Sequence, residues 1–197
     1  MTRSESWSIR PEQVLGRLPA RRAVPLTLFV LSLAVGVFCF DDKLSLSGDN
    51  TEFIILARSL AQGDGMTLIN FPTPRVATKY PFGFPLMLSP LAALFEPTSA
   101  SGMTDWVAMK WLIVLSFAAA IVVLYYLVCD QWGRPAAAAV AALTMTNPLL
   151  VDYGHQVMSE VPFLLFSLLA LLCLERGVRR REIAGNYWLL TGFAAMM

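Results

Sequence analysis

Apolar side chains gather into five stretches along this chain, separated by polar and charged residues. The stretches cover residues 24–40, 106–129, 135–151, 157–174 and 183–197. Roughly 17 to 25 apolar residues make a helix that crosses a bilayer, so the pattern predicts four complete spans and a fifth that is still apolar at Met197. Asn147 and Pro148, near the end of the third stretch, predict a bend. We therefore predict an all-α fold, a polytopic transmembrane helical bundle.

A long connection, residues 41–102, joins the first and second stretches and far exceeds the usual loop length. Within it, apolar residues recur with the spacing i, i+3, i+4, i+7 at Phe53, Leu56, Ala57 and Leu60. This spacing predicts a short amphipathic helix that lies in the plane of the membrane surface.

Capping residues mark both ends of this predicted helix. Asp49 is a favourable N-cap, and Glu52, three residues later, completes a capping box. Gly63 and Gly65 are suited to end the helix. The connection is therefore predicted to be folded rather than disordered.

Prolines shape the second half of the same connection. They are frequent over residues 71–85, which prevents a continuous helix and favours a rigid extended path. Residues 83–95 are apolar but too short to cross a bilayer, so we predict a second in-plane or re-entrant segment. Arg75 and Lys79 bring two cations close to the lipid.

The composition supports an integral membrane protein. Hydrophobic residues make up 56% of the 197 residues and charged residues only 15%, and the mean hydropathy is +0.59. A soluble domain of this size needs more polar residues for its surface. The net charge of +1 argues against a nucleic-acid partner. The three cysteines lack metal-ligand or C-x-x-C spacing and are expected to face lipid or core.

The positive charges predict the orientation in the membrane. Most of the 15 basic residues lie on alternate connections: before the first stretch, at Arg134, and over residues 176–181. Because cytoplasmic connections are enriched in Lys and Arg, we predict a multi-pass protein of the inner or plasma membrane with a cytoplasmic N-terminus. Residues 41–102 and the turn at His155 then form extracytoplasmic loops. The short fifth stretch suggests an N-terminal fragment of a longer protein, with residues 1–197 forming the first part of one transmembrane domain.

Five segments carry a family resemblance through their order and spacing. They are D-N-T-E-F at 49–53, K-Y-P-F-G-F-P-L at 79–86, G-R-P at 133–135, N-P at 147–148 and S-E-V-P-F at 159–163. Jointly, residues 24–176 resemble the N-terminal half of GT-C-type glycosyltransferases. These polyprenyl-phosphate-sugar-dependent enzymes include the protein O-mannosyltransferases and the lipid A aminoarabinose transferase.

The resemblance implies inverting transfer of a sugar from a polyprenyl-phosphate carrier to a lipid, glycan or protein acceptor on the extracytoplasmic side. Asp49 matches the family's acid after the first span and would take the proton from the acceptor hydroxyl. Lys79 matches the basic residue before the family's proline motif and would bind the donor phosphate. Further candidates are Arg75 and His155 for the phosphate, and Glu52 and Glu160 as supporting acids.

The sequence departs from the family pattern at two positions. Many relatives carry a second acid after the first, where this chain has Asn50, and the usual Pro-Pro pair is interrupted by Phe82. We therefore predict no metal ligands and no required cofactor. A divalent metal is compatible with the family, but Asn50 does not support it.

Each candidate also has a simpler structural interpretation. Asp49 serves equally well as a helix N-cap alone. Lys79 and Arg75 suit anchoring near lipid headgroups, His155 suits a solvated turn, and Glu160 suits the start of a helix as a favourable anion.

Two other functions remain open at this stage. A transporter or flippase subunit would use the in-plane segments as a gate and would place ionisable residues within the membrane. Lys110 is the one basic residue inside an apolar stretch, but it lies near the end of that stretch and is predicted to reach the headgroups. A non-catalytic membrane remnant is the other alternative.

Overall fold

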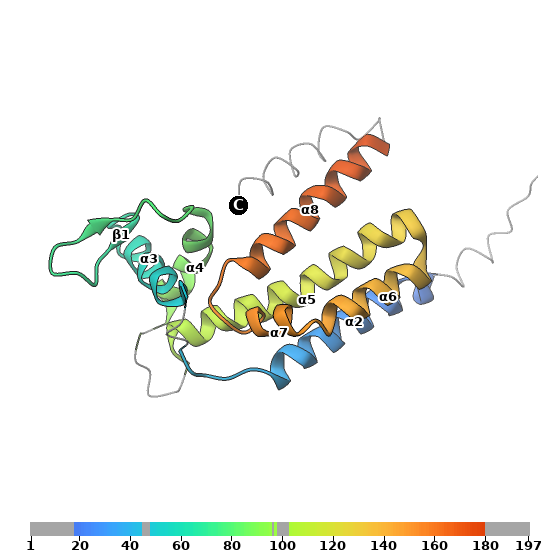
Figure 1. Ribbon diagram of the computed structural model, residues 1–197, viewed down its shortest axis with the longest axis horizontal. Coiled ribbons are helices and arrows are strands. Elements are labelled where there is room, and N and C mark those ends of the chain that lie inside the picture. The colour runs from blue at the N-terminus through green and yellow to red at the C-terminus, as the bar shows by residue number, and fades with distance from the viewer. Residues whose placement is uncertain (1–17, 45–47, 96, 98–102, 180–197) are drawn as a thin grey trace, which may run out of the picture.

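The computed structural model describes residues 18–44, 48–95, 97 and 103–179. These residues form seven helices and one short hairpin (Figure 1). The elements are α2 (Leu18–Phe38), α3 (Asn50–Gln62), β1 (Thr67–Leu68), β2 (Arg75–Val76), α4 (Gly83–Leu94), α5 (Asp105–Trp132), α6 (Arg134–Met145), α7 (Pro148–Tyr153) and α8 (Glu160–Arg179). The predicted all-α class is confirmed, and the hairpin, in which Thr67 pairs with Val76, was not predicted.

Helix α5 is the centre of the bundle, and α2, α6 and α8 pack along it (Figure 1). At 28 residues it is about 42 Å long, more than the roughly 30 Å of a bilayer core. In the described part of the chain, α5 and residues Glu160–Val178 of α8 are the two helices long and apolar enough to cross a membrane. Helix α2 approaches α5 closely at Gly36, where a Cβ would lie only 2.7 Å from the Val114 side chain.

The third predicted span is divided into two helices. Helix α6 ends at Met145, and Asn147 caps the start of α7 by accepting hydrogen bonds from the backbone N–H groups of Leu149 and Leu150, at 3.0 and 3.3 Å. Pro148 then occupies the first position of α7, where its missing N–H is tolerated. The predicted bend is confirmed, and α6 is only 12 residues long. The fifth predicted stretch, residues 183–197, lies outside the described residues.

Residues 48–95, which we call the loop module, pack against one end of α5 (Figure 1). Helix α3 packs on α4 through buried Phe53 and Ala57 on one side and Phe84 and Leu88 on the other. As predicted, α3 ends at Gly63, which has a φ of 86° that few other residues adopt. The apolar segment 83–95 forms α4, so both predicted helices of this connection are present.

Two ionic contacts, each with a buried partner on α5, join this helix to the chain on either side of Asp49. The Lys110 ammonium donates to the backbone oxygens of Asp41, at 3.0 Å, and Lys43, at 2.6 Å, and to the Asp41 carboxylate. Asp105 forms a two-point ion pair with Arg58. The side chain of Lys110 is only 2% exposed, so the prediction that it reaches the headgroups is wrong. Its charge is satisfied by the segment that follows α2.

Candidate active site

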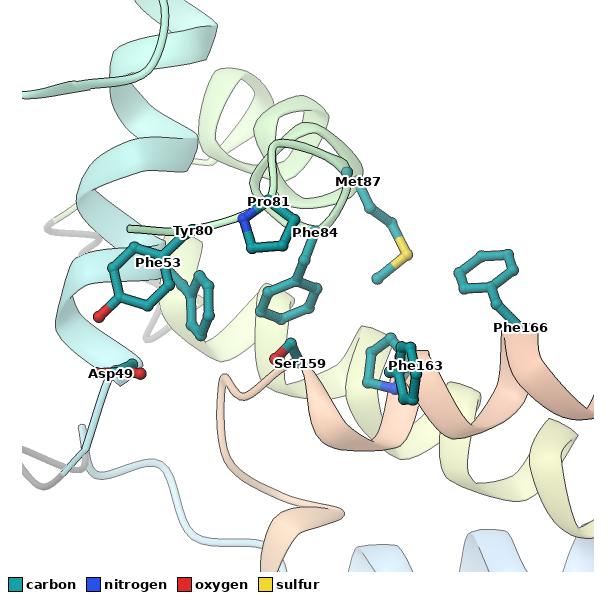
Figure 2. A pocket seen from close by; sticks show the side chains of 11 residues that line it. Asp49, Phe53, Tyr80, Pro81, Phe84, Met87, Ser159, Phe163 and Phe166 are labelled. Atoms are coloured by element: carbon teal, nitrogen blue, oxygen red, sulfur yellow. The ribbon is translucent and has the colours of Figure 1, made fainter. Parts of the chain in front are cut away.

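A cavity of about 190 Å³ lies between the loop module and the start of α8 (Figure 2). Most of its wall is apolar and its polar lining residues are Asp49, Tyr80 and Ser159. The complete lining comprises Asp49, Phe53, Tyr80, Pro81, Gly83, Phe84, Met87, Ser159, Pro162, Phe163 and Phe166. A hydrophobic pocket with a few polar groups on one side is the usual form of a small-ligand site.

Asp49 enters this cavity from the N-terminus of α3. Its backbone has φ −92° and ψ 5°, not the extended conformation of an N-cap, and it makes no side-chain hydrogen bond to the described first turn of α3. The predicted capping box with Glu52 is therefore wrong. The Asp49 carboxylate instead accepts a hydrogen bond from Lys79 Nζ at 2.9 Å.

Lys79 is the cation of the site and contacts three groups. Its ammonium donates to Asp49 and to the Tyr80 hydroxyl, and it lies 3.7 Å from the Glu52 carboxylate. The Lys79 side chain is 65% exposed and Asp49 38% exposed, so the pair is accessible to a ligand. The structure thus brings together three of the predicted residues: Asp49, Lys79 and Glu52.

These contacts stabilise the charged forms of Asp49 and Lys79 and the neutral form of Tyr80. Hydrogen bonds from Tyr80 and then from Lys79 hold the pKa of Asp49 below its ordinary value of 3.8. The pKa of Lys79 is raised chiefly by its hydrogen bond to Tyr80 and next by its hydrogen bond to Asp49. The pKa of Tyr80 is raised chiefly by partial burial and next by its hydrogen bond to Glu52. At neutral pH the site therefore contains a carboxylate, an ammonium and a neutral phenol.

Of the predicted site residues, which all lie in the described part of the chain, only Asp49 lines the cavity, and Lys79 and Glu52 adjoin it through their contacts with Asp49 and with each other. Arg75 lies on β2, where its guanidinium sits 5.3 Å from the Phe71 ring centre. His155 Nδ1 lies 3.0 Å from the Val151 carbonyl oxygen, at the end of α7. Glu160 is the exposed first residue of α8, and its neighbour Ser159 lines the cavity in its place. The structure gives these three predicted residues no contact with the Asp49–Lys79 pair among the described residues.

Two cavity residues had no predicted role. Tyr80 follows Lys79 directly and contacts it. Its position in the sequence, next to a candidate phosphate-binding lysine, was the feature that could have predicted a role for it. Ser159 belongs to the S-E-V-P-F segment but gave no signal of its own.

Asn50 occupies the position of the second acid of many relatives. It is 1% exposed, and its amide donates to the Gln156 side chain at 3.3 Å. In the described part of the chain, no three His, Cys, Asp or Glu side chains are grouped so that they could hold a metal ion. Independence from metal stays a prediction.

The family is shown by comparison with known proteins. The family model for dolichyl-phosphate-mannose-protein mannosyltransferase matches residues 79–197, more than half of the chain. The chain belongs to this family. Its members are glycosyltransferases that use a sugar carried on a polyprenyl phosphate, so the resemblance found in the sequence is confirmed. Comparisons with curated proteins and with solved structures gave no match. The mannosyltransferase match begins at Lys79, so Asp49 lies before it.

Proposed function

We propose that this chain carries the base and the donor-phosphate cation of an inverting mannosyl transfer from polyprenyl phosphate to an acceptor hydroxyl on the extracytoplasmic side. The observation that supports this most directly is the Asp49–Lys79 pair at the edge of the cavity. A carboxylate and an ammonium side by side match the two charges that such a transfer requires.

In the proposed reaction, Asp49 accepts the proton of the acceptor hydroxyl while the acceptor oxygen attacks C1 of the sugar. The bond between C1 and the phosphate oxygen breaks, and its electron pair leaves with the polyprenyl phosphate. Attack opposite the leaving group inverts C1. Because the leaving group is already an anion, it requires a cation rather than an acid, and Lys79 supplies that charge.

The apolar wall of the cavity fits the lipid part of the same donor. Met87 of α4 and Phe163 and Phe166 of α8 form one side, away from the Asp49 carboxylate (Figure 2). α8 is one of the two helices suited to cross a membrane, so a lipid phosphate that approaches along it would meet apolar side chains before the charged pair. Residues 41–102 would then lie outside the cytoplasm, as the arginine distribution predicts.

Asp49→Asn tests the role of the base. The amide has nearly the same shape but cannot take a proton, so we expect transfer to fall by about 10²- to 10⁴-fold. The assay measures transfer of radiolabelled mannose from polyprenyl-phosphate mannose by the whole chain in proteoliposomes. Asp64→Asn, in the exposed turn after α3, is the matched control and should keep normal transfer.

Two results would contradict this function. Near-normal transfer by the Asp49→Asn variant would remove the base assignment. If the wild-type chain in proteoliposomes neither transferred mannose nor bound the lipid donor, a gate subunit or a non-catalytic membrane protein would be the better interpretation.

A further inference from the structure

Tyr80 packs against a cluster of buried aromatic rings. Its ring packs on Phe53 with a centre-to-centre distance of 4.8 Å, and Phe53 meets the ring of Phe84 nearly edge-on at 4.8 Å. Phe53 and Phe84 are 4% and 7% exposed. Such contacts leave an aromatic side chain little freedom. The position of the Tyr80 hydroxyl is therefore set by the core of the loop module.

The Lys79 side chain, in contrast, has little packing that would fix its position. Its side chain is mostly exposed and has four flexible carbons, which cost entropy to order. The hydroxyl of Tyr80 and the carboxylate of Asp49 accept its hydrogen bonds. An ammonium has three N–H donors, and no further hydrogen bond from this nitrogen is made to the described residues. The Glu52 carboxylate lies 3.7 Å from this nitrogen, beyond hydrogen-bonding distance, so an incoming oxygen would compete with Glu52 for the third donor.

A phenol is well suited to hold a cation that must still attract an anion. A carboxylate in its place would add a further negative charge beside Lys79, whereas the neutral hydroxyl accepts a hydrogen bond and adds no charge. Asp49 and Glu52 already supply two negative charges near this ammonium. A third acid would weaken the attraction for a phosphate.

We propose that Tyr80 is a positioning residue whose hydroxyl fixes the Lys79 ammonium at the edge of the cavity, where it meets the phosphate of the lipid donor. This inference rests on the proposed function for its donor-binding half. The fixed position of Lys79 itself does not depend on that function.

Tyr80→Phe removes the hydroxyl and keeps the ring that packs on Phe53. The matched control is Tyr126→Phe on α5, where the ring contacts Tyr125 and Arg176, away from the cavity. Lysine reactivity gives a measurement that needs no donor, because the chain has only three lysines, Lys43, Lys79 and Lys110. Acetylation of Lys79 relative to the exposed Lys43 is followed by mass spectrometry under conditions of partial modification.

We expect Tyr80→Phe to raise the acetylation of Lys79 relative to Lys43 by about three- to tenfold, the effect of one lost hydrogen bond. We expect the Tyr126→Phe control to leave it unchanged. In detergent micelles, Tyr80→Phe should also weaken the binding of polyprenyl phosphate by a similar factor. The binding of polyprenol, which lacks the phosphate, should not change.

The possible results test separately whether Tyr80 fixes Lys79 and whether the fixed Lys79 binds the donor phosphate. An unchanged acetylation ratio in Tyr80→Phe would overturn the fixing of Lys79 by Tyr80, whatever the donor. A raised ratio with unchanged polyprenyl phosphate binding would overturn the donor-binding half. If the wild-type chain bound polyprenol as tightly as polyprenyl phosphate, the proposed function and that half would both fail, while the acetylation ratio would still decide whether Tyr80 holds Lys79.

Discussion

The ion pair between Arg58 and Asp105 gives a sharp test of how the loop module is attached to α5. The Asp105 side chain has no exposed surface. Arg58 donates to its two oxygens at 2.5 and 2.8 Å, and the backbone N–H of Trp106 donates to one of them at 2.8 Å. Arg58→Leu removes the two side-chain donors and leaves a buried carboxylate with one backbone partner.

The expected cost follows from this burial. Removing one partner of a buried ion pair typically costs about 3–5 kcal/mol, because the remaining charge is neither solvated nor paired. The Arg58 side chain is 27% exposed, so water can partly replace it, and we expect about 3 kcal/mol. The double variant Arg58→Leu/Asp105→Leu removes both charges and should cost only about 1 kcal/mol, mainly for the lost partner of the Trp106 N–H.

Thermal unfolding in detergent measures this difference. The three free cysteines, Cys39, Cys129 and Cys173, are half-buried and can report unfolding through a thiol-reactive dye. About 2–4 °C per kcal/mol applies to a domain of this size, so Arg58→Leu should lower the apparent Tm by about 6–12 °C. Arg75→Leu, on exposed β2, is the matched control and should change it little.

Two outcomes would refute this reasoning. An unchanged Tm in Arg58→Leu would show that Asp105 is not a buried charge that depends on Arg58. If the double variant melted below Arg58→Leu, the loss would come from packing rather than from an unpaired charge.

The remaining predictions concern Lys110 and Asp49. Lys110→Met removes the donor that holds the carbonyl groups of Asp41 and Lys43, so trypsin should cleave after Lys43 several-fold faster than in the wild-type chain. An unchanged cleavage rate would show that this contact does not restrain the segment. Because Tyr80 and Lys79 lower the pKa of Asp49, its carboxylate stays charged as the pH falls to 3.8, and kcat/KM should show no loss due to this residue above about pH 4. A loss centred between pH 5 and 7 that Asp49→Glu displaced would contradict this assignment.

The sequence predicted the elements whose cause is local. Apolar runs are sufficient to predict α5 and α8, because a helix satisfies its own backbone hydrogen bonds and an apolar surface on all sides suits a lipid environment. Gly63 ends α3, and Asn147 with Pro148 divides the third stretch, through interactions within a few residues. Such effects do not depend on the rest of the fold.

The site could be predicted only in part, because its contacts join distant residues. Local rules made Asp49 a cap for α3, but Lys79, 30 residues later, takes its carboxylate instead. Lys110 likewise contacts residues 67 and 69 positions earlier. A sequence shows which hydrogen bonds and ion pairs each side chain can form, but it does not show which of several partners the fold places next to it.

Two ionic contacts link α5 to the chain on either side of Asp49, the proposed base. Lys110 holds the chain about six residues before Asp49, and Asp105 holds α3 nine residues after it, and both lie on the same end of α5. The Arg58–Asp105 pair therefore ties α3, which Asp49 precedes, to α5, against which α8 also packs. Loss of this ion pair should therefore alter the distance between Asp49 and the cavity residues of α8. In the proposed reaction, in which Asp49 is the base, this predicts a fall in kcat for Arg58→Leu that exceeds any change in the KM for the lipid donor.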